Sequence, residues 1–323
     1  MLAACMRGAD LQTSERVDVH PDAAPSLGPS SPALAPGDPL FSLARRALTG
    51  EFRTLRAQLH HGQLPTPEQI HEARIAIRRI RVALRLFRDF LPAQARHFRD
   101  EFGSLGRALG AIRELDVLES VAEQITDSAM RAEFRQSIGS ARDDASGRLS
   151  GLLSTDRFAL LFGQFSDFVG REPSLAVKRR WRSLRIHDAA RADVGRTLRA
   201  VLKRGRKISA ETSPDTLHRL RIQAKHLRYE AEFYADFDPA LHRLARGAKR
   251  LQDVLGAYRD ACDASDRLRD FARHGPPERM ADRAFAVAPL IQRQREEAAE
   301  ARRSFPRAWR RFERLAGRVK LRG

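Results

Sequence analysis

Cysteine, tyrosine and tryptophan are scarce in this chain of 323 residues, which has two cysteines, three tyrosines and two tryptophans. Cys5 and Cys262 are too few and too far apart in the sequence for a disulfide framework or a zinc site, which favours a reducing compartment. The sequence has no run of the roughly 18 apolar residues that span a membrane, and no signal-peptide pattern. We therefore expect a cytoplasmic protein. So few tyrosines and tryptophans also argue against the aromatic stacking platforms of single-strand nucleic-acid binders.

Lysine is scarce too, since only six of the 59 basic residues are lysines. The formal net charge is nevertheless +18 and the pI is about 11.2. This excess predicts a polyanionic partner, which could be nucleic acid, an anionic membrane surface or an inorganic phosphate polymer. Arginine is the better bidentate ligand for phosphate oxygens, although codon composition can produce the same bias. Charge alone does not choose among these partners.

Hydrophobic periodicity separates a tail from a folded part. Residues 1–40 are rich in Pro, Ser, Ala and Gly and show no hydrophobic period, which predicts a disordered tail. From residue 41 onward, apolar residues recur at spacings of three and four, with short breaks and no alternating strand pattern. We therefore predict an all-α fold over residues 41–321.

The helical part repeats itself in order. FRTLRAQLHHG (52–62) returns as GRTLRAVLKRG (195–205), HEARIAIRRIR (71–81) as HRLRIQAKHLR (218–228), and LGAIRELDV (109–117) as LGAYRDACD (255–263). A weaker echo pairs residues 155–169 with 304–317. Such self-similarity indicates architecture, and it predicts two helical bundles, residues 41–172 and 180–321, related by a pseudo-twofold axis.

Each copy of the second repeat opens a predicted helix in the same way. Thr66 and Ser213 stand at the N-cap position, and each is followed by a proline and an acid. On a helical wheel the basic side chains of each copy gather in one stripe. The stripes are His71, Arg74, Arg78, Arg81 and Arg85 in the first copy, and His218, Arg221, Lys225 and Arg228 in the second, with Glu232 in the place of Arg85. The histidines lie near helix N-termini, which favour anions, so binding of a phosphate should strengthen in mild acid.

Apolar residues flank each stripe on both sides, whereas a solvated basic face would have one apolar stripe opposite it. We therefore expect the stripes to line a groove or pore between helices, with Arg79 and His226 turned toward solvent. Like charges held there repel one another and lose hydration unless a polyanion or fixed carboxylates compensate. The alternative is that Asp and Glu side chains from other helices neutralise the stripes.

The pattern H-x-x-R-x-x-x-R/K-x-x-R at the start of a helix, present twice and followed by LGxxR motifs, resembles the CHAD domain, the conserved histidine α-helical domain. The resemblance covers nearly all of the chain after the tail. It implies two pseudo-symmetric helical bundles, a basic central channel that binds inorganic polyphosphate, and association with polyphosphate granules in bacteria. By motif, it assigns phosphate binding to both stripes, and Arg85 joins them by helix geometry alone.

The LGxxR motifs add less specific candidates for the same ligand. Arg113 and Arg259 would either contact phosphate or form a buried pair with Asp116 or another acid. Lys249 and Arg250 precede the second motif, but their counterparts in the first half are not basic. The E-x-E-x-K strand of the CYTH triphosphatase domain, which adjoins some CHAD domains, does not occur. We therefore expect a stand-alone binder.

Two other functions remain open. His187-Asp188 is the dipeptide of HD metal-dependent phosphohydrolases, but that chemistry needs several His and Asp ligands on one metal. The sequence also has no P-loop, HExxH or GxSxG motif. A nucleic-acid-binding module is supported by charge but lacks a reading motif, and a duplex is too wide for a groove between neighbouring helices. We predict non-enzymatic binding of inorganic polyphosphate, with no cofactor and no metal.

Overall fold

The computed structural model describes residues 33–171, 184–274 and 276–319. These residues form nine α-helices and two 3₁₀ turns, and their β-structure is limited to one isolated bridge between Pro39 and Arg185. The predicted all-α fold is confirmed. The hydrophobic spacing explains it locally: α1, for example, buries Leu40, Leu43 and Ala47 on one face.

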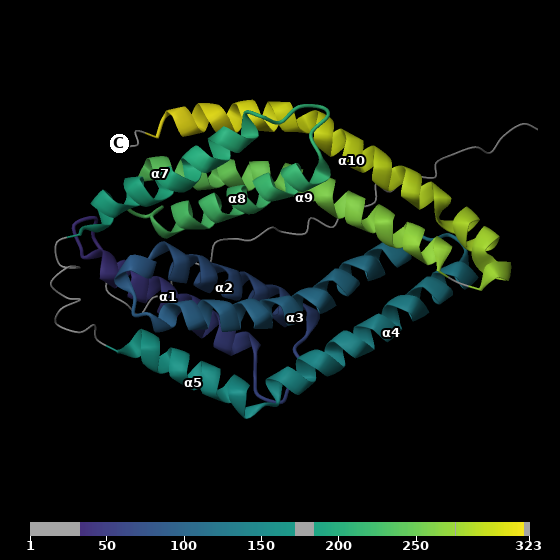
Figure 1. Cartoon of the computed structure of the whole chain (residues 1–323), viewed down its shortest axis with the longest axis horizontal. Helices are drawn as coiled ribbons and strands as arrows, with labels where there is room; N and C mark the ends of the chain where they lie inside the picture. The colour runs from purple at the N-terminus through teal and green to yellow at the C-terminus, as the bar shows by residue number, and fades with distance from the viewer. Residues whose placement is uncertain (1–32, 172–183, 275, 320–323) are drawn as a thin grey trace, which may run out of the picture. The chain divides into compact units, whose positions relative to one another are not determined.

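Two series of helices follow one another along the chain (Figure 1). The first series is α1 (Leu40–Gln58), α2 (Pro67–Leu86), α3 (Gln94–Ala122), α4 (Ser128–Leu153) and α5 (Asp156–Gly170), with a 3₁₀ turn at Arg88–Phe90. The second is α7 (Ile186–Gly205), α8 (Pro214–Phe233), α9 (Pro239–Arg273) and α10 (Met280–Gly317), with a 3₁₀ turn at Pro277–Arg279.

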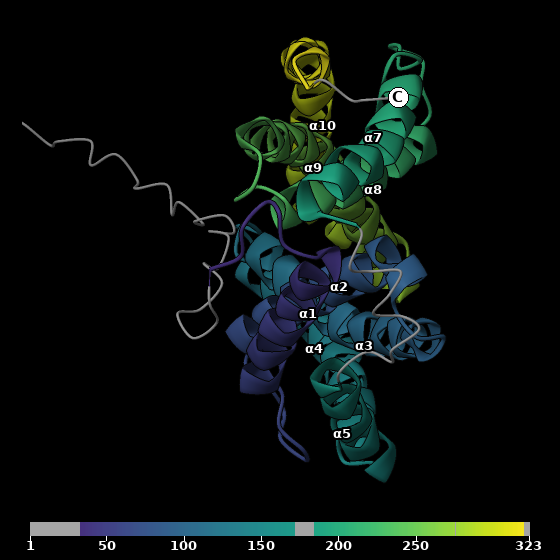
Figure 2. The ribbon, with the colours of Figure 1, turned by 90° about the vertical axis from the view of Figure 1, so that its left-hand side faces the viewer.

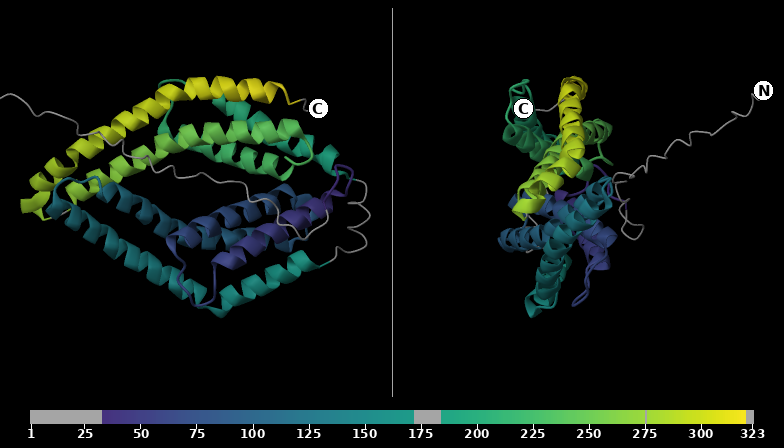
Figure 3. Two further views of the ribbon diagram at one scale, coloured as in Figure 1. Left: turned by 180° about the vertical axis from the view of Figure 1, so that it is seen from behind. Right: turned by 90° about the vertical axis from the view of Figure 1, so that its right-hand side faces the viewer.

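The packing order is the same in the two series. Helix α1 packs on α2 and α2 on α3, while α7 packs on α8 and α8 on α9. Each repeated segment lies at the corresponding place, because residues 52–62 belong to the end of α1 and 195–205 to the end of α7. The main difference is that the partner of α9 is one long helix, α10, which lies beside it over most of its length (Figure 3).

The two series touch in several places, including α1 with α7, and two of these contacts lie on either side of the basic stripes. Helix α2 contacts α8, and Figures 1 and 2 both show these helices facing each other. A separate apolar cluster joins α3 and α4 to α9 and α10 through residues that include Phe134, Leu268 and Val287. Beside it, Arg283 donates to Glu133 at 2.6 Å, so an ion pair also crosses between the series. These two contacts fix α2 against α8.

The segment just before α1 is tied to the start of α7. The backbone N–H of Leu40 donates to the oxygen of Leu184 at 3.0 Å, and the N–H of Ile186 donates to the oxygen of Asp38 at 3.1 Å. Residues 35–39 of the predicted tail are thus held by hydrogen bonds. Residues 1–32 lie outside the described residues, and the prediction for them stays a prediction.

Candidate anion-binding site

The helices that carry the two stripes begin at the predicted residues, but their caps differ. At α2, the Thr66 hydroxyl accepts from the Gln69 backbone N–H at 3.3 Å, and the Gln69 side chain accepts from the Thr66 N–H at 2.8 Å. This capping box holds the first turn. At α8, Ser213 occupies the N-cap position but its hydroxyl contacts Thr216 at 3.1 Å instead of a backbone N–H.

Basic side chains of α2 and α8 converge where the two helices meet. The Arg78 guanidinium donates to the Tyr229 hydroxyl of α8 at 3.2 Å. Burial and, after it, the positive charges of Arg78, Arg221 and Arg74 together lower the pKa of Lys225 to about 7. Burial alone lowers a lysine pKa, and like charges close to the partly dehydrated ammonium group lower it more. Two of these neighbours belong to α2, so the stripes meet across the contact.

We call Arg74, Arg78 and Arg81 of α2, with Arg221 and Lys225 of α8, the central basic cluster. Within the described residues, none of the five is ion-paired with a carboxylate. Burial lowers the pKa of Arg74, and the nearby positive charges of Arg78 and Arg113 lower it further. The negative charges of Glu114 and Asp116 act in the opposite direction. Asp260 lies near Arg221 and Lys225, but none of these carboxylates forms an ion pair with the cluster, so they offset only part of the mutual repulsion.

Two of these cations lie against the glycines of the LGxxR motifs, at distances that would leave a methyl group there in ordinary contact. The Arg74 guanidinium donates to the backbone oxygen of Gly110 at 3.2 Å, and a methyl group at Gly110 would lie 3.9 Å from its central carbon. In the second series, a methyl group at Gly256 would lie 3.6 Å from the Arg221 Nε. That nitrogen is buried and has no hydrogen-bond partner. Corresponding glycines thus support corresponding arginines.

Sequence reasoning missed two arginines of α3 near the exposed end of the cluster. Burial lowers the pKa of Arg81, and the charges of Arg107 and Arg99 lower it further. The Arg81 guanidinium packs over Gly103, where a methyl group would lie 3.3 Å from it. The sequence did not indicate that Arg107 lies near the stripe, because only the packing of α2 on α3 shows which arginines of α3 approach it.

Arg79 was predicted to face solvent, and that prediction is wrong. Its side chain is buried and donates to Glu51 of α1 at 2.5 Å and to Glu232 of α8 at 2.8 Å. Arg228, a predicted phosphate ligand, is also buried and donates to Glu232 at 2.7 Å. The wheel sector assigned to solvent is the face through which α2 packs on α8.

Two other residues of that sector, Glu230 and His226, are covered as well, whereas Glu72 and Arg219 are exposed as the wheel predicts. Glu230 is 3% exposed and accepts from Arg85 at 2.7 Å, while the Arg85 guanidinium also contacts the His226 Nδ1 at 3.0 Å. Burial and the charge of Arg85 lower the pKa of His226 to about 4, so this ring is neutral at physiological pH. Arg85 therefore has a carboxylate partner, and His226 is not turned toward solvent as predicted.

The two predicted histidines lie at the margins of the cluster. His71 is exposed at the second turn of α2, and His218 is partly buried at the corresponding place in α8. The buried Nδ1 of His218 has no hydrogen-bond partner, and burial together with the charges of Arg259 and Arg221 lowers its pKa. An anion bound beside His218 would reverse this shift.

The less specific candidates from the LGxxR segments lie in different surroundings. Arg259 forms a two-point pair with Asp263 (2.8 and 2.7 Å), whereas Arg113 makes no ion pair with any described residue. Lys249 pairs with Asp253 at 3.1 Å. Arg250 lies with other arginines at a cavity between α9 and α10, away from the central basic cluster.

The family follows from comparison with known proteins. A family model described as the CHAD domain matches residues 46–269, which is more than half of the chain and includes the whole central basic cluster. The chain belongs to the CHAD family. The crystal structure of the CHAD domain from the plant Ricinus communis is similar in fold, with a TM-score of 0.64 and 20% sequence identity. That similarity covers 90% of this chain and 95% of the plant chain. No curated protein matches.

Three features of this CHAD domain bear on a metal-dependent enzyme activity or a membrane partner. His187 contacts its neighbour Asp188 at 3.2 Å and the backbone oxygen of Pro36 at 3.0 Å. Among the residues that the structure describes, no three His, Cys, Asp or Glu side chains are grouped so as to hold a metal ion. No described helix is long and apolar enough to cross a membrane.

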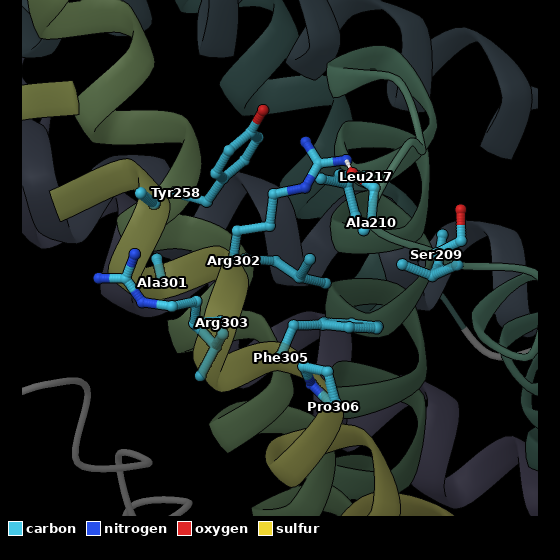
Figure 4. Close-up of a pocket in the computed structure, with 13 residues that line it drawn as sticks. Ser209, Ala210, Leu217, Tyr258, Ala301, Arg302, Arg303, Phe305 and Pro306 are labelled. Carbon is cyan, nitrogen blue, oxygen red and sulfur yellow. Dashed lines mark hydrogen bonds between the residues drawn. The ribbon is translucent and has the colours of Figure 1, made fainter. Parts of the chain in front are cut away.

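An apolar pocket of about 420 Å³ lies in the second series of the CHAD domain, between α9, α10 and the segment before α8 (Figure 4). Arg302 extends across it, donates to the backbone oxygen of Ala210, and lies 5.9 Å from the centre of the Tyr258 ring. Arg303, at the edge, pairs with Glu300 at 2.7 Å. Because both arginines are engaged, the pocket adds no cation to the anion-binding site.

Proposed function

We propose that this CHAD domain binds inorganic polyphosphate, without chemical turnover, through the central basic cluster. The observation that carries the proposal is the convergence of Arg74, Arg78, Arg221 and Lys225 at the contact between α2 and α8, where none of the four forms an ion pair with a described carboxylate. Such an arrangement is unfavourable in the free protein and becomes favourable when a polyanion enters. Fixed carboxylates form ion pairs with Arg79 and Arg85. Asp260 acts on Arg221 and Lys225, and Glu114 acts on Arg74, only through their charges and without an ion pair.

A linear phosphate chain suits the geometry of the cluster. Its cations come from two helices, and an unbranched chain carries one negative charge per phosphate along its length, so it can contact both helices at once. Guanidinium groups bind phosphate oxygens through two parallel hydrogen bonds. Nucleic acid offers the same backbone charge but surrounds it with sugars and bases, which would have to fit beside buried Tyr229 and partly buried His226.

The test removes one cluster arginine from each helix. Arg74→Gln combined with Arg221→Gln should weaken binding of long-chain polyphosphate by roughly a hundredfold or more, since each charge-assisted hydrogen bond contributes about 1.5–3 kcal/mol. The matched control is Arg53→Gln with Arg219→Gln, which removes the same charge from exposed positions on α1 and α8. Both doubles should keep the wild-type circular dichroism, and the cluster double should melt no lower than the wild type, because it removes mutual repulsion.

The outcomes separate the alternatives. Equal affinities of the two double variants would contradict the proposal, because binding would then follow net charge alone. Duplex or single-stranded DNA that competes as well as polyphosphate at the same salt concentration would favour the nucleic-acid alternative. Release of orthophosphate from polyphosphate by the purified protein, abolished in the cluster variant, would show that the domain is an enzyme after all.

A further inference from the structure

A second concentration of positive charge lies apart from the central basic cluster. A cavity of about 300 Å³ between α9 and α10 is lined by Arg250, Arg311, Arg314, Leu315 and Arg318. Arg250 comes from α9, and the others come from the last turns of α10 and its C-cap. Four of the five lining side chains are therefore guanidinium groups on exposed residues.

Carboxylates next to the cavity are engaged elsewhere. Asp253, one turn from Arg250, pairs with Lys249 at 3.1 Å. Glu313, beside Arg314 in the sequence, accepts from Arg206 of α7 at 2.7 Å. Within the described residues, none of the four lining arginines makes an ion pair. The cavity thus keeps its positive charge.

Compensation of a helix dipole explains only part of this cluster. Cations at a helix C-terminus are stabilised by the macrodipole, and Arg314 and Arg318 stand at the end of α10. Arg250 lies in the interior of α9, where the dipole offers no such stabilisation. It lines the same cavity as Arg311 and Arg314, so like charges from two helices come together, which the helix dipole does not account for.

The cavity is separate from the central basic cluster. Arg250 and Arg259 are nine residues apart in α9, which places them about 180° apart around the helix. The charge of Arg259 acts on His218 at the margin of the central cluster, whereas Arg250 faces α10. A ligand in the cavity would therefore approach α9 from the side opposite the central cluster.

We propose that this cavity binds a condensed phosphate anion, either a free short oligophosphate or the end of a longer chain. Four guanidinium groups supply more two-point donors than a single carboxylate could accept, and they match an anion with several phosphate groups. The volume equals that of roughly ten water molecules, which suits an anion of about two or three phosphates. If the ligand is the end of a longer chain, the inference rests on the proposed function. Binding of a free oligophosphate would not depend on that function.

The test compares two double variants that remove one arginine from α9 and one from α10. Arg250→Gln with Arg314→Gln alters the cavity, and Arg267→Gln with Arg295→Gln removes the same charge from exposed positions on the same two helices. Calorimetric titration with sodium tripolyphosphate at constant ionic strength should show at least roughly tenfold weaker binding for the cavity variant than for the control. Long-chain polyphosphate, titrated in parallel, tells whether chain ends also bind.

Combining each double variant with Arg74→Gln and Arg221→Gln separates the two sites. We expect tripolyphosphate binding to persist when only the central cluster is altered and to be lost when the cavity is altered too. Cavity and control variants with the same affinity for both phosphate ligands would overturn this inference and leave the proposed function standing. A single-stranded DNA oligonucleotide that loses as much affinity as tripolyphosphate in the cavity variant would overturn the assignment to condensed phosphates.

Discussion

Lys225 makes polyphosphate binding sensitive to pH. Its pKa in the free protein is lowered to about 7 by burial and by Arg78, Arg221 and Arg74. A bound phosphate chain places negative oxygens beside the ammonium group and should return the pKa toward the ordinary value of about 10.4. Each pKa unit corresponds to about 1.36 kcal/mol, or a factor of ten in affinity.

The direction and range follow from these two pKa values. Below about pH 7 the lysine is already protonated in the free protein, so its contribution to affinity is fully present. Above about pH 7 the free protein loses the proton while the complex keeps it, so binding must take up a proton. We expect affinity to fall by up to about tenfold per pH unit between about pH 7 and the pKa of the complex.

The assay is calorimetry with long-chain polyphosphate, whose internal phosphates do not titrate in this range, from about pH 6 to about pH 9. Two buffers of different ionisation enthalpy report proton uptake directly. Lys225→Arg should bind at every pH with little proton uptake, because arginine stays charged. Wild-type affinity that is flat across this range, or the same proton uptake in Lys225→Arg, would show that Lys225 does not take up the proton.

Three further predictions concern stability and use chemical denaturation followed by circular dichroism. Arg79→Gln should lower the free energy of unfolding by about 3–5 kcal/mol, because it leaves Glu51 buried and unpaired; a loss below about 1 kcal/mol would contradict the buried network. His226 binds protons less readily when folded than when unfolded, so stability should fall by up to about 3 kcal/mol from pH 6.5 to about pH 4, and His226→Gln should flatten this fall. Gly205→Ala should destabilise by about 1–3 kcal/mol, because the new methyl group would lie 2.0 Å from the Trp309 ring; unchanged stability would contradict that packing.

The sequence predicted the class of fold and the start of both basic helices. Hydrophobic spacing and the Thr66-Pro67 and Ser213-Pro214 starts depend on local rules, and the structure begins α2 and α8 at those prolines. The CHAD resemblance also came from spacing within single helices. These properties need no knowledge of which helices become neighbours.

The surroundings of each cation could not be predicted in the same way. A helical wheel gives the angle of Arg79 but not the helix that covers it, and Glu51 and Glu232 are 28 and 153 residues away. One signal was present in the sequence: Glu232 stands where the first copy has Arg85. An acid that replaces a base in only one of two repeated stripes indicates a partner in the other copy, here Arg79.

The contact between α2 and α8 thus separates paired from unpaired cations. Arg79 and Arg85 have glutamate partners and hold the helices together, whereas Lys225 has none and destabilises the free protein. Between about pH 7 and its unfolded pKa, the unfolded chain binds more protons than the folded one, so this destabilisation is fully present only below that window. A domain that keeps such a lysine folds less stably than it could, and it regains that stability when a polyanion binds. Ligand-induced stabilisation should therefore be smaller in Lys225→Met, although that free protein is more stable than the wild type.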